Sequence, residues 1–107
     1  MLYGAGGIQI GAGCLIATST VIVASDHLFD APDIPIAQQG SVAAGIHIGD
    51  DVWLSAGVRV LDGVAIGQGA VVGANAVVNR AIPPFAVAVG IPARVIKMRP
   101  GFNEHKG

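Results

Sequence analysis

One histidine at a break in the pattern and a group of late cations are the side chains best suited to chemistry. His27 lies in the stretch ASDHLFDAPDIPIAQQG, residues 24–40, which also holds two prolines and interrupts an otherwise regular chain. An imidazole gains and loses a proton near neutral pH, so it can remove a proton from an attacking hydroxyl or amine. The cations gather late in the chain, at Arg94, Lys97 and Arg99. Such a cluster suits an anionic partner, because guanidinium and ammonium groups bind phosphate oxygens.

The other two histidines do not stand at such a break. His47 falls in the middle of an expected strand, on its outward side, and we expect it at the surface or an interface. His105 belongs to a polar tail, NEHKG. A zinc enzyme of the carbonic anhydrase type needs about three histidines at one metal. Since His27 and His47 alone could contribute, we expect no metal site.

A six-residue repeat describes the elements that must position these groups. One aliphatic series recurs at Ile48, Leu54, Val60, Ile66, Val72 and Val78, and a second apolar series at Val52, Val58, Val64, Ala70, Ala76 and Ile82. The two series bracket single residues, as in Val52-Trp53-Leu54, which is the in-out-in alternation of a short strand. Three six-residue sides would make a coil of about eighteen residues, and stacked coils form a parallel β-solenoid.

The repeat predicts one domain with four parts. An N-terminal coil spans residues 8–28, an excursion loop 29–45, C-terminal coils 46–82, and a cap and tail 83–107. In this register Asp26 takes an inward position and His27 the outward position next to it. Proline-rich sequence ends the repeat, and residues 93–98 are expected to form a short capping helix.

Composition favours self-association and limits the class of partner. Hydrophobic residues make up 52% of the 107 residues and charged residues 12%. A small domain cannot hide that much apolar surface alone, so copies of the chain are expected to cover each other. The formal charge of −1 does not favour nucleic acid or a membrane surface as partner. Polar residues interrupt every apolar run well short of a membrane span, and a lone Cys14 fits a cytoplasmic protein.

Residues 45–97, GIHIGDDVWLSAGVRVLDGVAIGQGAVVGANAVVNRAIPPFAVAVGIPARVIK, resemble the C-terminal half of the hexapeptide-repeat acyltransferases. The sugar O-acetyltransferase and xenobiotic acetyltransferase branch is the most similar. The resemblance implies an all-β fold, a left-handed parallel β-helix with one protruding loop and a short C-terminal cap. It also implies a homotrimer with clefts between subunits. The implied reaction moves an acetyl group from acetyl-CoA to a hydroxyl or amine of a small molecule, without a metal.

The resemblance also implies a set of site residues. His27 corresponds to the general base. Residues expected beside coenzyme A are Trp53 at the cleft, Ala56 and Ala74 at corners along the pantetheine arm, Asn79 and Arg80 in the run NAVVNRAIPP, and Arg94 and Lys97 near the nucleotide phosphates.

A non-catalytic interpretation stays open beside the enzyme. Ala76 and Ala81 stand where the family usually has polar or acidic residues, and the chain is short. A shortened relative that persists as a trimeric structural module would have the same repeat.

Overall fold

The computed structural model describes residues 2–3 and 7–101, and His105 lies outside this part. Short strands dominate, with a single 3₁₀ turn η1 (Ile36–Gln38) among the described residues. The strands are β1 (Leu2–Tyr3), β2 (Ile8–Ile10), β3 (Leu15–Ile16), β4 (Val21–Val23), β5 (Asp26–His27), β6 (Ser41–Val42), β7 (Ile46–Ile48), β8 (Trp53–Leu54), β9 (Arg59–Val60), β10 (Ala65–Ile66), β11 (Val71–Val72), β12 (Val77–Val78), β13 (Ala86–Val89) and β14 (Arg94–Met98).

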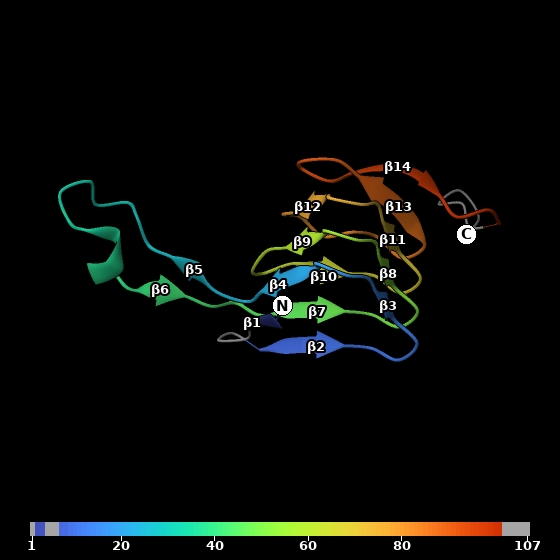
Figure 1. The fold of residues 1–107 in the computed structure, drawn as a ribbon, viewed down its shortest axis with the longest axis horizontal. Helices are drawn as coiled ribbons and strands as arrows, with labels where there is room; N and C mark the ends of the chain where they lie inside the picture. Colours follow the sequence, from blue (N-terminus) through green and yellow to red (C-terminus); the bar gives the residue numbers. More distant parts are fainter. Residues whose placement is uncertain (1, 4–6, 102–107) are drawn as a thin grey trace.

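The strands wind into a three-sided prism, with one sheet on each side (Figure 1). Face A orders its strands β1-β4-β9-β12, face B β10-β7-β2, and face C β14-β13-β11-β8-β3. Parallel pairing joins residues eighteen positions apart, such as Trp53 with Val71 and Arg59 with Val77. The predicted coil of three six-residue sides is therefore confirmed.

The core is the axis of the prism, filled by the two apolar series of the repeat. All twelve predicted inward residues between Ile48 and Ile82 are buried, each with at most 4% of its surface exposed. The first coil is different. Ile10 and Ile16 pair with Ile48 and Leu54, yet they stay 36% and 41% exposed, because β2 and β3 are the outermost described strands of their sheets.

Glycine at the corner between faces B and C is required by the close stacking of coils. Gly11, Gly49 and Gly67 follow the strands of face B one above another. A Cβ atom on Gly49 would lie 2.8 Å from the backbone nitrogen of Gln68 in the next coil. Because that neighbour is backbone, no side-chain rotation relieves the clash, and the corner accepts a hydrogen atom alone.

The excursion leaves the coil earlier than the register predicts, which corrects the placement of Asp26 and His27. Ala24 is the last buried residue before it, and Asp26 is exposed instead of inward. Its expected inward position is filled by the returning chain at Ile46, which is buried. Asp26 and His27 form β5, which pairs antiparallel with β6 in a hairpin that projects from the prism (Figure 1).

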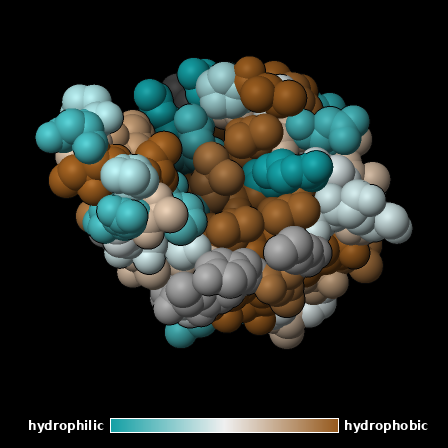
Figure 2. All heavy atoms as spheres, turned by 60° about the vertical axis from the view of Figure 1, so that its left-hand side comes forward, coloured by the Kyte–Doolittle hydropathy of each residue, from teal (hydrophilic) through white to brown (hydrophobic). Residues whose placement is uncertain are grey.

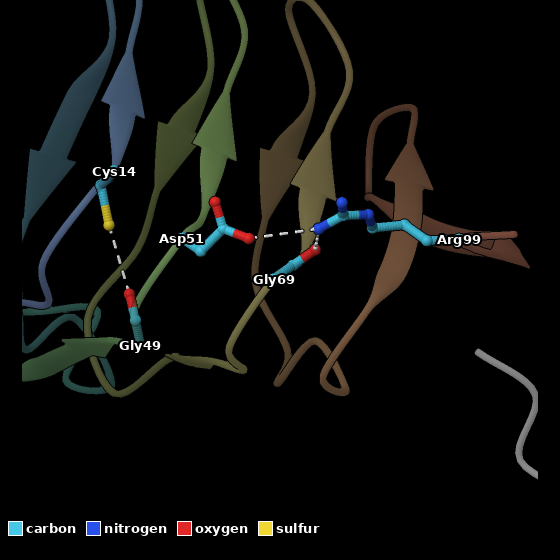
Figure 3. A network of polar contacts seen from close by, with 5 residues as sticks. All are labelled: Cys14, Gly49, Asp51, Gly69 and Arg99. Carbon is cyan, nitrogen blue, oxygen red and sulfur yellow. Dashed lines mark hydrogen bonds and ion pairs between the residues drawn. The ribbon is translucent and has the colours of Figure 1, made fainter. Parts of the chain in front are cut away.

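The C-terminal cap is a strand and not the expected helix. β14 folds back antiparallel along β13 and becomes the edge strand of face C. Val95 and Ile96 are β-branched residues that favour such an extended conformation. Arg99 then fastens the cap: its Nη1 lies 3.1 Å from the Gly69 carbonyl oxygen and 3.4 Å from Asp51 Oδ2 (Figure 3).

Across the described ranges, no helix reaches the length and apolar character needed to cross a bilayer.

The packing of the axis gives a direct stability prediction. Leu54→Ala removes a fully buried side chain and should lower the free energy of unfolding by about 2–5 kcal/mol through lost burial and the cavity left behind. Leu61→Ala, the same change at a side chain 41% exposed, should cost less than about 1 kcal/mol. Chemical denaturation of both variants measures the difference, and equal losses would contradict the inward and outward assignment.

Candidate functional site

His27 stands near the base of the projecting hairpin, with its ring free. It pairs with Ser41 across the hairpin, and its backbone N–H donates to Asp26 Oδ1 at 2.9 Å. The side chain is exposed. Within residues 2–3 and 7–101, neither ring nitrogen makes a hydrogen bond. The geometry thus leaves an imidazole able to accept a proton from a molecule placed beside it.

Asn79 and Arg80 lie at the same edge of the prism as the hairpin. They follow β12 on face A, whereas the excursion leaves after β4 on that face, two strands away in the same sheet. Both side chains are exposed. The excursion that carries His27 and the segment with Asn79 and Arg80 therefore leave the prism at the same edge, between faces A and B, two coils apart.

Trp53, Lys97 and two valines form one row across face C. The register pairs Trp53 with Val71, Val71 with Val87, and Val87 with Lys97. Trp53 points outward, as the alternation predicts, and is 48% exposed. With strands about 4.8 Å apart, the row spans roughly 14 Å and joins an indole to an ammonium group through apolar side chains.

Ala56 and Ala74 stand at the edge between faces C and A, on neighbouring coils. Both are exposed, and the Ala56 carbonyl oxygen accepts the N–H of Asn75 at 2.9 Å. Because the methyl side chains of Ala56 and Ala74 are small, a ligand can approach the backbone closely at this edge. Arg94 begins β14 on face C, with its guanidinium exposed apart from a 3.3 Å contact to the Ala93 carbonyl oxygen.

Lys97 also borders an apolar groove at the C-terminal end of the prism. The groove has a volume of about 550 Å³, and its lining consists of Pro83, Pro84, Val95, Ile96, Lys97 and Met98. An apolar groove with an ammonium group at its border fits a ligand that is part apolar and part anionic.

The predicted residues thus form two groups, and one chain does not bring them together. His27, Asn79 and Arg80 occupy one edge of face A, and the corner alanines occupy the other. A side of six residues spans up to roughly 20 Å, and its core is packed with buried aliphatic residues. A base from the first group cannot reach a ligand held by the second within the same prism.

Sequence reasoning missed two residues that shape the excursion. Asp62 accepts two backbone N–H groups where the excursion returns, from Ala44 at 2.7 Å and Gly45 at 2.8 Å. Gln39 stabilises the tip of the excursion, because its Nε2 donates to the carbonyl oxygens of Ala31 and Ile34 at 2.8 and 2.6 Å. In the sequence, Asp62 stood out only as an acidic residue at a corner of the six-residue repeat, a position that does not require a charged side chain.

The remaining described histidine, His47, lies apart on face B. Its Nδ1 is 3.0 Å from Gln9 Oε1, and its ring is exposed, as predicted for the outward side of β7. In the part of the chain that the structure describes, no three His, Cys, Asp or Glu side chains lie close enough to share a metal ion.

Comparison with known proteins identifies the repeat. Residues 45–80 match the bacterial transferase hexapeptide family, described as six repeats. A probable acetyltransferase of Mycobacterium tuberculosis is 44% identical over 92 residues, which are 86% of this chain and 31% of that protein.

Two solved structures show the same fold. A hexapeptide-repeat acetyltransferase of Vibrio cholerae, complexed with acetyl coenzyme A, is 35% identical with a TM-score of 0.83, over 91% of this chain and 52% of that one. A maltose O-acetyltransferase of Clostridium difficile is 38% identical with a TM-score of 0.80, over 87% and 49%. This chain therefore spans from about a third to a half of the relatives it matches.

The comparisons confirm the fold class, an all-β left-handed parallel β-helix of hexapeptide repeats. Together with eighteen-residue coils and buried aliphatic positions, they show that residues 45–80 carry the bacterial transferase hexapeptide repeat, folded as in the two acetyltransferases above.

Proposed function

We propose that the protein transfers an acyl group, most simply acetyl, from coenzyme A to a hydroxyl or amine of a small molecule such as a sugar. The observation that carries this proposal is the row on face C. It runs from Trp53 through Val71 and Val87 to Lys97, and Arg94 lies on the same edge strand. Coenzyme A combines an apolar arm with phosphates, so an apolar row that ends in cations fits its chemistry. The similarity to acetyltransferases, one of them complexed with acetyl coenzyme A, supports the same donor.

In the proposed mechanism, His27 is the general base. The donor supplies an activated thioester carbonyl. The imidazole removes the proton from the acceptor hydroxyl or amine as that oxygen or nitrogen attacks the carbonyl carbon. The new bond to the acceptor forms, the carbon–sulfur bond breaks, and the imidazolium returns its proton to the sulfur. Trp53, Ala56 and Ala74 would orient the donor, while Asn79, Arg80, Arg94 and Lys97 would hold its polar and phosphate groups.

A homotrimer is part of the proposal, because the two groups of residues lie at different edges of one prism. Packing the hairpin edge of one copy against face C of the next brings His27 to the row that starts at Trp53. Repeating that head-to-tail contact around a threefold axis closes the ring and makes three equal clefts. Exposed apolar side chains on both surfaces, such as Phe29 on the hairpin and Leu15 on face C, would then be covered.

A cytoplasmic location completes the proposal. Its support is the single Cys14, a free thiol, since thiols stay reduced in that compartment.

A non-catalytic trimeric module is the second candidate. One observation favours it: within the described residues, no side chain hydrogen-bonds the ring of His27 to orient it. A catalytic imidazole commonly has such a partner. Transfer assays with the two variants below separate the candidates.

Removal of the base gives the first functional prediction. His27→Ala should lower kcat/KM for acetyl transfer by about 100- to 10,000-fold, the usual contribution of a general base. His47→Ala removes another exposed imidazole, on face B, and should change kcat/KM less than about twofold. The measurement is release of free coenzyme A with a panel of sugars and amines. Equal turnover by wild type and His27→Ala would end the proposed role of His27.

Donor binding gives a second prediction. Arg94→Ala and Lys97→Ala should each weaken coenzyme A binding by about 10- to 100-fold, because each removes a charge-assisted hydrogen bond. Arg59→Ala is the matched control, since Arg59 lies on face A with its guanidinium bound to the carbonyl oxygens of Ser19 and Gly57. Titration calorimetry reports the three dissociation constants. Unchanged affinity in Arg94→Ala and Lys97→Ala would place the donor elsewhere.

The oligomer gives a third prediction. Analytical ultracentrifugation of the purified protein should show a species with three times the mass of the chain. A monomer at micromolar concentration would remove the basis for a shared site.

A further inference from the structure

One carboxylate binds two consecutive backbone amides where the His27 hairpin returns to the β-helix. We propose that Asp62 is a positioning residue: it anchors the returning end of the excursion and so sets where His27 stands. The catalytic part of this inference rests on the proposed role of His27.

Asp62 uses both of its oxygens on consecutive backbone amides. It lies at the corner after β9, where Oδ2 accepts the Ala44 N–H at 2.7 Å and Oδ1 accepts the Gly45 N–H at 2.8 Å. Next to it, the Gly63 N–H donates to the Gly45 carbonyl oxygen at 2.9 Å. Two short bonds to one charged group fix both the position and the direction of the chain at this point.

Little else ties the hairpin to the prism. Within the described residues, the hydrogen bonds of residues 26–42 all stay inside the excursion. The side chains of residues 26–30 are all exposed, so none of them is buried against the coils. Figure 2 shows the excursion as a separate lobe, with polar and apolar side chains next to each other. Its orientation in a single chain therefore depends on its two ends.

A short path leads from the anchor to the imidazole. Ala44 is two residues beyond Val42, which pairs with Asp26, and the neighbouring pair joins Ser41 to His27. His27 thus pairs with Ser41, three residues before Ala44, the first residue whose amide Asp62 binds. A shift at the anchor moves the imidazole with it, and a misplacement of about 1 Å can cost roughly 100-fold in rate.

A matched control exists on another corner. Asp50 also accepts a backbone N–H from a neighbouring coil, from Ala12 to Oδ1 at 2.8 Å. This contact joins the corners between faces B and C, away from the hairpin. Asp62→Asn and Asp50→Asn therefore remove the same charge from the same kind of contact, but only the first touches the excursion. In Asp62→Asn, the NH₂ group of the new side chain would also face one of the two backbone N–H groups, donor against donor.

The experiment measures acyl transfer, donor affinity and amide exchange on the intact protein. Asp62→Asn should lower kcat/KM by about 10- to 100-fold and leave the dissociation constant of coenzyme A within about twofold. Hydrogen–deuterium exchange should accelerate by about tenfold or more at Ala44, Gly45 and the hairpin amide of Leu28. Asp50→Asn should show neither the kinetic loss nor the faster exchange in the hairpin. Asp62→Ser, which keeps one neutral acceptor oxygen, is a second variant should Asp62→Asn fail to fold.

Equal kinetics and equal hairpin exchange in the Asp62 and Asp50 variants would overturn the inference. A wild-type protein that transfers no acyl group with any acceptor would defeat the proposed function and, with it, the catalytic part of this inference. The anchor is then judged on exchange alone: faster exchange at Leu28 in Asp62→Asn supports it, and unchanged exchange overturns it.

Discussion

The stacking of eighteen-residue coils in parallel register is the constraint on which the whole structure depends. Backbone hydrogen bonds join each coil to the next, as between Trp53 and the Ala70 carbonyl oxygen at 3.0 Å. That register places Leu54 directly on Val72 at the axis, where both side chains are fully buried. Because side chains alternate between the two surfaces of a strand, a slip of one residue would turn buried aliphatic side chains outward. Inward, outward and corner positions all follow from this one repeat.

The same constraint keeps the two groups of predicted site residues in one chain apart. The axis is filled with aliphatic side chains at close packing, so the prism cannot bend to bring two of its edges together. Among residues 2–3 and 7–101, the excursion alone leaves the prism, and the Asp62 carboxylate holds its returning end. Association of copies is then the simplest way to bring an imidazole on one prism to the row of Trp53 and Lys97 on another. The high apolar content, 52% of the residues, agrees with surfaces that meet in an assembly.

Much of the fold could be predicted from sequence because its period is visible in single residue types. The two apolar series between Ile48 and Ile82 predicted twelve buried positions, and the alternation predicted that Trp53 points outward. Two other features depend on contacts that a period does not encode. His27 left the coil because the returning residue Ile46 occupies the inward position expected for Asp26, and residues 94–98 became a strand because β13 offered a free edge. The anchor at Asp62 pairs with backbone amides, which have no signature in the side-chain pattern.

Mixed oligomers test most directly whether the site is shared between copies. Inactive His27→Ala chains and inactive chains carrying Arg94→Ala with Lys97→Ala would be unfolded together, refolded at equal amounts and assayed for acetyl transfer. A site built from two copies predicts recovery of about a quarter of wild-type activity, since each of the two contributing copies is intact with an even chance. Activity that stays at the level of the separate variants would contradict a shared site, and would mean that His27 serves the donor groups of its own chain.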